Sequence, residues 1–397
     1  MMHFIHNAVQ IIKHKKKVIF NKFSIQNDNI TNLYFLRKLA VTKVEIQRCK
    51  KVNIIGLPEN LVELSLITCM LKNIDSLINM KNIRLLNVSQ NLLDNIDVLI
   101  NFLNLTTLKL SHNVDINLQH VGLLVQVREL IIDGIGFSDL QFLENLTGLT
   151  YLSMNGNKIS DISIISHLIN LEQLFLNSNY IADLSPLQSL ICLQTLIANN
   201  NSIVNLSILP VSLQSLQLCC NQIYNICPLS SLCNLELLYL DQNHITDLQP
   251  LNNLKSLFKL KLSKNIIINI IPLQDLNINY LDLSGNLILT VKPIQNMNCE
   301  LLLLQFNFIS EILQMKAKNV IIAEQANPPK GYQIVNKRIE AVFETQNIQS
   351  LLLMRKNIKR QADMKIQILE MIEKAEMKIL KLSQFTVQMF EEDYATQ

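Results

Sequence analysis

The chain has 397 residues, of which 49% are hydrophobic but only 6% aromatic, and tryptophan is absent. Globular cores normally draw on aromatic side chains for bulk, so this composition disfavours an ordinary globular core and favours a repeated motif of Leu, Ile and Asn. The net charge of +3 is too small to create a general field that attracts nucleic acid or an anionic membrane.

The cysteines are too sparse for a secreted disulfide scaffold, and none forms a C-x-x-C pair. We therefore expect reduced thiols that serve mostly as small apolar residues. That usage favours a cytoplasmic location. The cysteines are Cys49, Cys69, Cys192, Cys219, Cys220, Cys227, Cys233 and Cys299.

Residues 1–19 are predicted to cap the N-terminal end of a repeat array, with apolar side chains such as Phe4 and Val9 turned inward. The apolar stretch precedes the basic run at 13–17, which is the reverse of the order in a signal peptide. No apolar stretch is long enough to predict a membrane span. We interpret the basic run as a solvated edge; a nuclear signal or nucleic-acid contact is the alternative.

Between residues 20 and 327 the pattern L-x-x-L-x-L-x-x-N returns about every 22 residues, which predicts a solenoid of about 12–14 repeats. One copy consists of Leu171, Leu174, Leu176 and Asn179. The alternating leucines place the inner face of a short strand in the core. The asparagine amide can satisfy buried main-chain groups where the chain turns. This asparagine recurs as Asn91, Asn113, Asn157, Asn179, Asn201, Asn221, Asn243, Asn265, Asn286 and Asn307.

Besides the degenerate first copy, which has Asp28 at the asparagine position, three copies depart from this pattern there. Cys49 and Cys69 occupy it in two early copies, a substitution that the repeat template permits. Ile135 occupies it in a third copy, flanked by Gly134 and Gly136. Because an isoleucine side chain cannot hydrogen bond, we expect an irregular turn there.

The outer half of each repeat has apolar residues at every third position, as at Ile159, Ile162 and Ile165. That spacing suits 3-10 turns better than an α-helix. A proline at the start of a turn removes no donor that is needed there, so we expect no long outer helices in the later repeats. The prolines at this repeat position are Pro186, Pro228, Pro250, Pro272 and Pro293.

The segment 179–187, Asn-Tyr-Ile-Ala-Asp-Leu-Ser-Pro-Leu, resembles the class of leucine-rich repeats about 22 residues long. That class includes the regulatory leucine-rich repeat subunit of protein phosphatase 1 and the bacterial internalins. The resemblance covers residues 20–327 and implies an α/β fold, a curved horseshoe solenoid with a parallel sheet on its concave side and short 3-10 turns on its convex side. It also implies protein binding on the concave side. The chain departs from the phosphatase regulator in lacking tryptophan anchors and in having a long C-terminal tail.

The Pro-Pro-Lys-Gly sequence at 328–331 predicts a domain boundary, with a linker at 328–335. Residues 336–393 contain neither Gly nor Pro and carry apolar residues at helical spacing, which predicts a helical tail. Its heptad is imperfect, so we expect local packing or partner binding, with a dimerising coiled coil as the alternative. Its seam positions include Arg355, Lys365 and Glu376.

The residues beside the second and third leucine of each repeat should point out of the concave sheet. They form a candidate contiguous apolar surface, and exposed aromatic residues are typical interface anchors. A dozen strands about 4.8 Å apart would span roughly 55 Å, enough for a globular domain. The alternative is that these side chains only stack on each other. The apolar members are Ile131, Tyr151, Phe175, Ile197, Leu237 and Tyr239, the basic members Lys259, Lys261 and Lys264, and the acidic members Glu129, Asp133, Asp241 and Asp282.

The sequence contains no Gly-rich phosphate loop, HExxH pattern or EF-hand pattern. Four cysteines between 219 and 233 fit no common zinc spacing. His112 and His120 near Asp115 are interpreted as inert surface residues rather than acid–base machinery. We therefore predict no catalytic residue, no metal and no cofactor.

Together these features predict a non-catalytic scaffold that holds a protein partner on its concave face, without nucleic acid or membrane. One alternative is a regulatory subunit of a Ser/Thr protein phosphatase. Another is a structural protein that dimerises through its C-terminal helix.

Overall fold

The computed structural model describes residues 22–26, 31, 33–38, 41–50, 52–114, 116–309 and 314–322. All of them belong to the first of the chain's two units, Met1–Lys330. The predicted N-terminal cap at 1–19, the linker at 328–335 and the helical tail at 336–393 lie outside the described residues.

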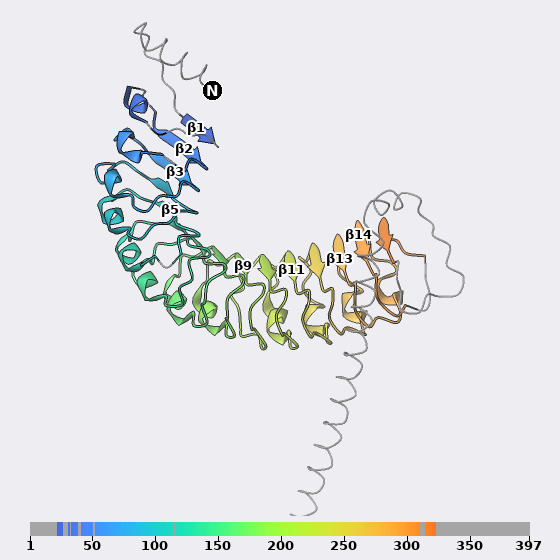
Figure 1. Cartoon of the computed structure of the whole chain (residues 1–397). Helices are drawn as coiled ribbons and strands as arrows, with labels where there is room; N and C mark the ends of the chain where they lie inside the picture. The colour runs from blue at the N-terminus through green and yellow to red at the C-terminus, as the bar shows by residue number, and fades with distance from the viewer. Residues whose placement is uncertain are drawn as a thin grey trace, which may run out of the picture. The chain divides into compact units, whose positions relative to one another are not determined.

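The described residues form a 15-stranded parallel sheet in which every strand pairs with the next one in sequence. Figure 1 shows the arrows along the inner side of an arc, so the predicted concave parallel sheet is confirmed. The strands are β1 (Lys22–Gln26), β2 (Lys43–Gln47), β3 (Glu63–Ile67), β4 (Leu85–Asn87), β5 (Thr107–Lys109), β6 (Glu129–Ile131), β7 (Tyr151–Ser153), β8 (Gln173–Phe175), β9 (Thr195–Ile197), β10 (Ser215–Gln217), β11 (Leu237–Tyr239), β12 (Lys259–Lys261), β13 (Tyr280–Asp282), β14 (Leu301–Leu303) and β15 (Asn319–Ile321).

Short 3-10 helices lie on the outer side of the arc, and no α-helix occurs among the described residues. The predicted 3-10 turns are therefore confirmed, and the five recurring prolines lie in the first turn of the last five. None of the described helices is long and apolar enough to cross a bilayer. The helices are η1 (Tyr34–Lys38), η2 (Ile54–Gly56), η3 (Asp75–Leu77), η4 (Asp97–Asn101), η5 (Gln119–Leu123), η6 (Gln141–Leu143), η7 (Ser163–His167), η8 (Ser185–Ser189), η9 (Cys227–Ser231), η10 (Gln249–Leu251), η11 (Ile271–Leu273) and η12 (Lys292–Ile294).

An Asp or Asn side chain fixes the start of most outer turns by accepting a main-chain hydrogen bond from two residues ahead. At η8, Asp183 Oδ1 accepts from the Ser185 N–H at 2.8 Å, and Asp183 Oδ2 accepts from the Ser185 hydroxyl at 2.6 Å. The hydroxyl bond is the main reason that the pKa of Asp183 is lowered. Asn95, Asp139 and Asp247 hold the starts of η4, η6 and η10 in the same way.

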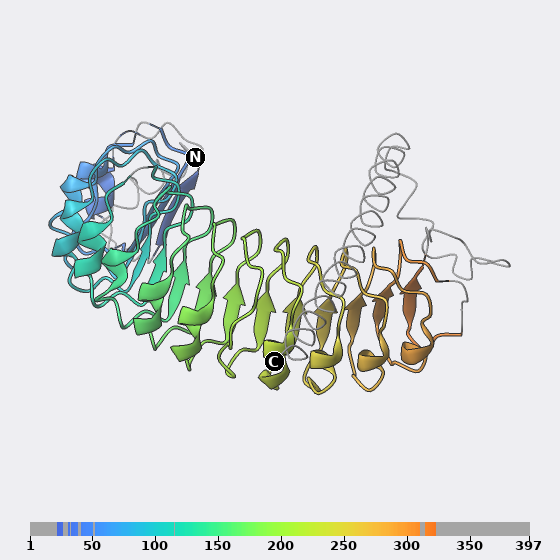
Figure 2. The same ribbon diagram turned by 90° about the horizontal axis from the view of Figure 1, so that it is seen from below.

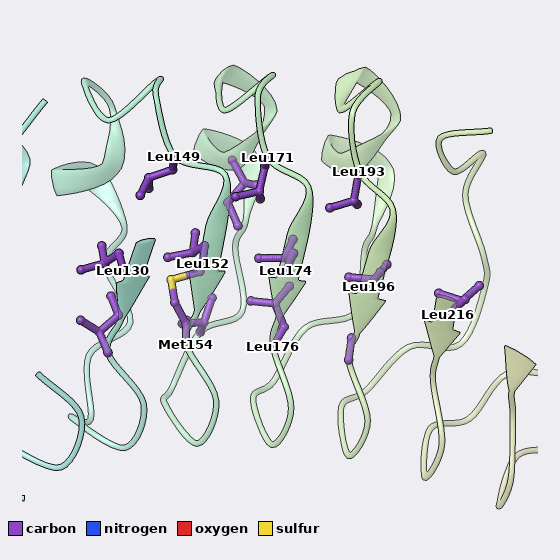
Figure 3. Packing of buried hydrophobic residues seen from close by; sticks show 14 of the residues in the cluster. Leu130, Leu149, Leu152, Met154, Leu171, Leu174, Leu176, Leu193, Leu196 and Leu216 are labelled. Atoms are coloured by element: carbon purple, nitrogen blue, oxygen red, sulfur yellow. The ribbon is translucent and has the colours of Figure 1, made fainter. Parts of the chain in front are cut away.

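The core is a stack of leucine rows that runs through the solenoid from repeat to repeat. In β8 and β9, Leu174 and Leu196 are cross-strand partners, and both are fully buried. Figure 3 shows these leucines in one row with Leu152 and Leu216, and Figure 2 shows the repeats side by side from below. Because each leucine is covered by its counterparts in the two neighbouring repeats, burial depends on stacking rather than on folding within one repeat.

The predicted asparagines form a ladder below the strands. Asn243 shows the bonds of one rung: its Nδ2 donates to the Leu218 carbonyl of the preceding repeat at 2.9 Å and to the Leu240 carbonyl at 3.1 Å. Its Oδ1 accepts from the Ile223 N–H at 2.9 Å. The ten asparagines are all buried except Asn201, which is half-buried.

In the repeats without this asparagine, other side chains occupy the ladder position. The Cys69 thiol points at the carbonyls of Ile46 and Ile67 at 3.6 and 3.4 Å, as a weak donor in place of the amide. Ile135 is buried and makes no side-chain hydrogen bond; Gly134 and Gly136 beside it both have positive φ, 62° and 103°. The ladder therefore has a gap at Ile135, between Asn113 and Asn157.

Candidate interaction surface

The concave face carries two columns of side chains, because the first and third residues of each central strand point outward and the middle one is buried. Most members of the columns are half-exposed, but Ser153, the third residue of β7, is buried. All nine residues predicted for partner binding lie in these columns, and all are half-exposed. The first column contains Tyr151, Leu237 and Lys259, and the second contains Ile131, Phe175, Ile197, Tyr239, Lys261 and Asp282.

One apolar group lies on β6 to β9 and consists of Ile131, Tyr151, Phe175 and Ile197; we call it the Tyr151 group. The rings of Tyr151 and Phe175 lie 5.0 Å apart between centroids and are tilted by 33°. Ile197 is the cross-strand partner of Phe175. Partial burial, followed by the charge of Glu129, raises the pKa of the Tyr151 hydroxyl, so this ring stays neutral at physiological pH.

The apolar surface is not contiguous, in contrast to the expectation from the sequence. Strand β10 places Ser215 and Gln217 between the Tyr151 group and the residues of β11. Both are polar and half-exposed. Strand β10 therefore separates the large side chains of β6 to β9 from those of β11 to β13 on the concave face.

The second group lies on β11 to β13 and consists of Tyr239, Lys259, Lys261 and Tyr280; we call it the Lys259 group. The Lys259 Nζ lies 5.3 Å from the Tyr239 ring centroid and 4.7 Å from that of Tyr280. The Lys261 Nζ lies 4.8 and 5.8 Å from the same two centroids. Both ammonium groups are thus framed by two tyrosine rings in cation–π geometry.

Tyr280 was not among the residues predicted from the sequence. The signal was present, because Tyr280 precedes the second leucine of its repeat, as Tyr151 does in its own. Partial burial is the main reason that the pKa of Tyr280 is raised. Lys264, which was predicted with the lysines of β12, lies instead in the following turn, where its φ is 55° and its side chain is exposed.

The lysines of the concave face fall into two kinds. Towards the N-terminal end of the sheet each one pairs with a glutamate of the next strand: Lys22 with Glu45 at 2.8 Å, Lys43 with Glu63 at 2.5 Å, and Lys109 with Glu129 at 2.7 Å. Within the described part of the chain, Lys259 and Lys261 have no such ion pair.

The carboxylates near the Lys259 group are bonded to the protein itself. Asp282 accepts from the Ser284 N–H at 3.0 Å and from the Ser284 hydroxyl at 2.6 Å. Asp241 accepts from the N–H and the hydroxyl of Ser263, both at 2.8 Å. Burial is the main reason that the pKa of Asp282 is raised.

A second polar ladder, which was not predicted from the sequence, follows the third leucine in four consecutive repeats. Asp133, Asn155, Asn177 and Asn199 each accept from the main-chain N–H of the next residue in this series, at 2.6 to 2.8 Å. Asp133 was predicted for the acidic rim of the partner surface, but its Oδ1 is occupied by Ser153 and Asn155. These polar side chains therefore stabilise the edge of the sheet.

The eight cysteines are all free. Burial, followed by the charge of Asp241, raises the pKa of Cys219 to about 12. In the part of the chain that the structure describes, no cluster of His, Cys, Asp and Glu could hold a metal ion. His120 Nδ1 lies 2.5 Å from Asp97 Oδ1, and Asp115 is outside the described residues.

No protein-family model matches the sequence, and no curated protein does. Among solved structures, an internalin of Listeria monocytogenes is 24% identical over 81% of this chain and 95% of its own, with a TM-score of 0.64. A leucine-rich repeat protein of Leptospira interrogans is 22% identical over 80% of this chain and 87% of its own, with a TM-score of 0.69.

A plant structure is similar over part of its own length. The leucine-rich repeat ectodomain of the membrane receptor kinase GASSHO1/SCHENGEN3 of Arabidopsis thaliana, solved with CASPARIAN STRIP INTEGRITY FACTOR 2, is 18% identical over 78% of this chain and 50% of its own. Its TM-score is 0.54. At these identities the likeness concerns the fold.

Proposed function

We propose that this chain, which has the leucine-rich repeat fold, is a non-catalytic scaffold that holds a protein partner on its concave face. The observation that carries the proposal is the gathering of Tyr151, Phe175, Tyr239 and Tyr280 on one face of the sheet, half-exposed. Tyrosine and phenylalanine bury a large area for little conformational entropy, and they are enriched in the centres of protein interfaces.

The main chain beneath this face favours the same function. Two polar ladders satisfy main-chain groups in the turns after several central strands, so these strands are held before any partner arrives. Binding to a preorganised surface avoids the cost of ordering it. The plant receptor ectodomain, which has a similar fold, was solved in complex with CASPARIAN STRIP INTEGRITY FACTOR 2.

The test is a double substitution in the Tyr151 group. The tagged chain is used to capture partners from an extract of the source cells, the captured protein is identified and purified, and its affinity is measured by calorimetry. Tyr151→Ala with Phe175→Ala should weaken that affinity at least about tenfold, since truncating central aromatic anchors commonly removes 2 kcal/mol or more, or roughly 30-fold.

The matched control is Tyr180→Ala with Tyr224→Ala. Both tyrosines are exposed, at 62% and 52%, and neither lies on a strand of the sheet. The control should retain full affinity. If the Tyr151 and Phe175 variant keeps its melting temperature and binds the partner as well as the unaltered chain, the proposed surface is refuted.

Two more specific hypotheses belong to the same proposal, one about the class of partner and one about self-association. A Ser/Thr phosphatase is the partner class suggested by the sequence resemblance, and a change in phosphatase activity on mixing with the purified chain would support it. Dimerisation through residues 336–393 would make the chain a structural component, and light scattering separates a dimer from a monomer. We further propose a cytoplasmic location, with the nucleus as the alternative, because the eight free cysteines suit a reducing compartment.

A further inference from the structure

We infer that the Lys259 group receives a carboxylate of an acidic segment in the protein partner. This inference rests on the proposed function and names the chemistry of one contact within it. The group spans β11 to β13, the outer two of which are labelled in Figure 1. It lies apart from the Tyr151 group, with β10 between them.

The geometry brings two positive charges to one place. Lys259 and Lys261 are the first and third residues of β12, so their Cα atoms lie about 6.6 Å apart along the strand. Their ammonium groups both lie within 5.8 Å of both tyrosine centroids. The rings attract each cation but do not remove the repulsion between the two. An anion between the two ammonium groups would relieve that repulsion.

Other lysines of the concave face indicate which anionic group pairs with a lysine on this sheet. Lys43 forms an ion pair with Glu63, which lies directly opposite it on the next strand, and Lys109 forms one with Glu129, which lies diagonally across on the next strand. The cross-strand neighbours of Lys259 and Lys261 are Leu237, Tyr280, Tyr239 and Asp282. Only Asp282 has a carboxylate, and that carboxylate is bonded to Ser284. Within the described residues no side chain forms an ion pair with Lys259 or Lys261, which leaves this position open to a carboxylate of a partner molecule.

The surroundings favour a carboxylate over a phosphate. Asp241 and Asp282 lie beside the group, and their charges oppose an approaching anion. A phosphorylated residue brings nearly two negative charges and meets this repulsion more strongly than a glutamate does. No arginine, the residue best suited to bidentate phosphate recognition, occurs on β11, β12 or β13.

The experiment measures binding of fluorescein-labelled peptides to the full chain by polarisation at physiological salt. One peptide alternates glutamate with alanine, so that its carboxylates repeat with the spacing of alternate strand residues. The second replaces glutamate with glutamine, and the third replaces it with phosphoserine. We expect the glutamate peptide to bind and the glutamine peptide to bind at least about tenfold more weakly, as for the loss of a close charge pair.

The decisive variant is Lys259→Gln with Lys261→Gln, which should lower affinity for the glutamate peptide about tenfold. Lys259→Arg with Lys261→Arg keeps both charges and should restore most of the binding. Lys43→Gln with Lys109→Gln removes the same formal charge from the same face, at lysines that already have partners. This control should bind like the unaltered chain.

Equal losses in the two glutamine variants would mean that only net charge matters, and would overturn the inference. Tighter binding of the phosphoserine peptide, or no binding of the glutamate peptide, would overturn it as well. The proposed function is tested separately by Tyr151→Ala with Phe175→Ala, which leaves the Lys259 group in place. If that variant loses affinity for the purified partner, the proposed function stands even when one of these outcomes overturns the inference.

Discussion

Asp282 lies on β13 beside Lys261 and Leu303, yet its carboxylate is bonded to Ser284. Its surroundings oppose the ionised form: burial raises the pKa most, the hydroxyl and N–H of Ser284 lower it, the charge of Asp241 raises it, and Lys261 lowers it. The net result is a pKa above the ordinary aspartate value. At the scale of one residue, the sheet therefore carries a carboxylate that is less stable as an anion when folded than when unfolded.

This shift gives a pH-dependent prediction with a definite sign. Because the folded pKa is raised, the ionised carboxylate costs stability at neutral pH, and that cost disappears as the pH falls below the folded pKa. Asp282→Asn keeps an oxygen that can accept from Ser284, so it should raise the melting temperature at neutral pH by a few degrees at most. The gain should shrink towards zero near about pH 4, close to the pKa of an unperturbed carboxyl.

Thermal melts followed by circular dichroism at the two pH values would measure this difference. Asp275→Asn, at an exposed carboxylate of the outer side, is the control and should change the melting temperature little at either pH. A gain for Asp282→Asn that is the same at both pH values would contradict the assignment.

At the scale of the element, the turn after each strand is the costly part of the repeat. The residue before the ladder position has a left-handed backbone in most repeats, as at Gln242 with φ 56° and at Lys264 with φ 55°. For a residue other than glycine this conformation costs about 1–2 kcal/mol. The buried asparagine that follows offsets the cost, because its amide bonds several main-chain groups that water cannot reach.

Asn243→Ala tests this account of the turn. It would leave the Leu218 and Leu240 carbonyls and the Ile223 N–H without the amide, so we expect the free energy of unfolding to fall by about 2–4 kcal/mol. Urea denaturation followed by circular dichroism measures the change. Asn234, whose amide donates to the Val211 carbonyl in an exposed position, is the control, and Asn234→Ala should cost less than about 0.5 kcal/mol. Equal effects of the two substitutions would be incompatible with a structural ladder.

The elements could be predicted from the sequence because their causes are local and repeated. Leucines such as Leu174 recur at positions that must face the core, and prolines such as Pro186 mark the outer turns. The second polar ladder could not be predicted in this way. A residue such as Asn177 follows the strand pattern and suggests an outward side chain, and only the register between repeats places the Asn199 N–H within 2.8 Å of its oxygen.

The sequence predicted which side chains of the candidate site face the concave side, but not all of the contacts between them. The alternation of the strand placed Lys259 and Lys261 on the concave face, as the structure has them. It could not indicate that each ammonium group lies near both Tyr239 and Tyr280, because one of the two ring contacts of each lysine is diagonal between neighbouring strands. Nor could it show that Asp133 and Asp241 are bonded within the edge of the sheet.

At the scale of the whole solenoid, stability comes from contacts between neighbouring repeats, so a weak interface divides the array. The asparagine ladder has its gap at Ile135, which lacks both the donors and the acceptor of an amide. On either side, Asn113 and Asn157 keep their bonds to their own preceding repeats. The interface between β5 and β6 therefore lacks this rung and is held by the strand pairing, the leucine stacking and the ion pair of Lys109 with Glu129.

Hydrogen exchange followed by mass spectrometry should reveal two cooperative units that meet at this gap. We expect the amides of β2 to β5 to exchange together at one denaturant concentration and those of β6 to β14 to exchange together at a higher one, because the ladder is continuous from Asn157 to Asn307 and Asn157 bonds back to Ile132 after β6. The exposed outer turns serve as the internal reference for rapid exchange. A single transition for all strands would show that the missing rung has no energetic consequence.

The strictly sequential order of the strands has a consequence for how such a chain can change during evolution. Duplication of one repeat at β10 would give every new main-chain group the neighbour it needs, since the strands before and after it are joined in the same register. The Tyr151 group and the Lys259 group would then lie one strand farther apart, about 4.8 Å. Gain or loss of a whole repeat can therefore alter the distance between the two groups while the packing of the core stays the same.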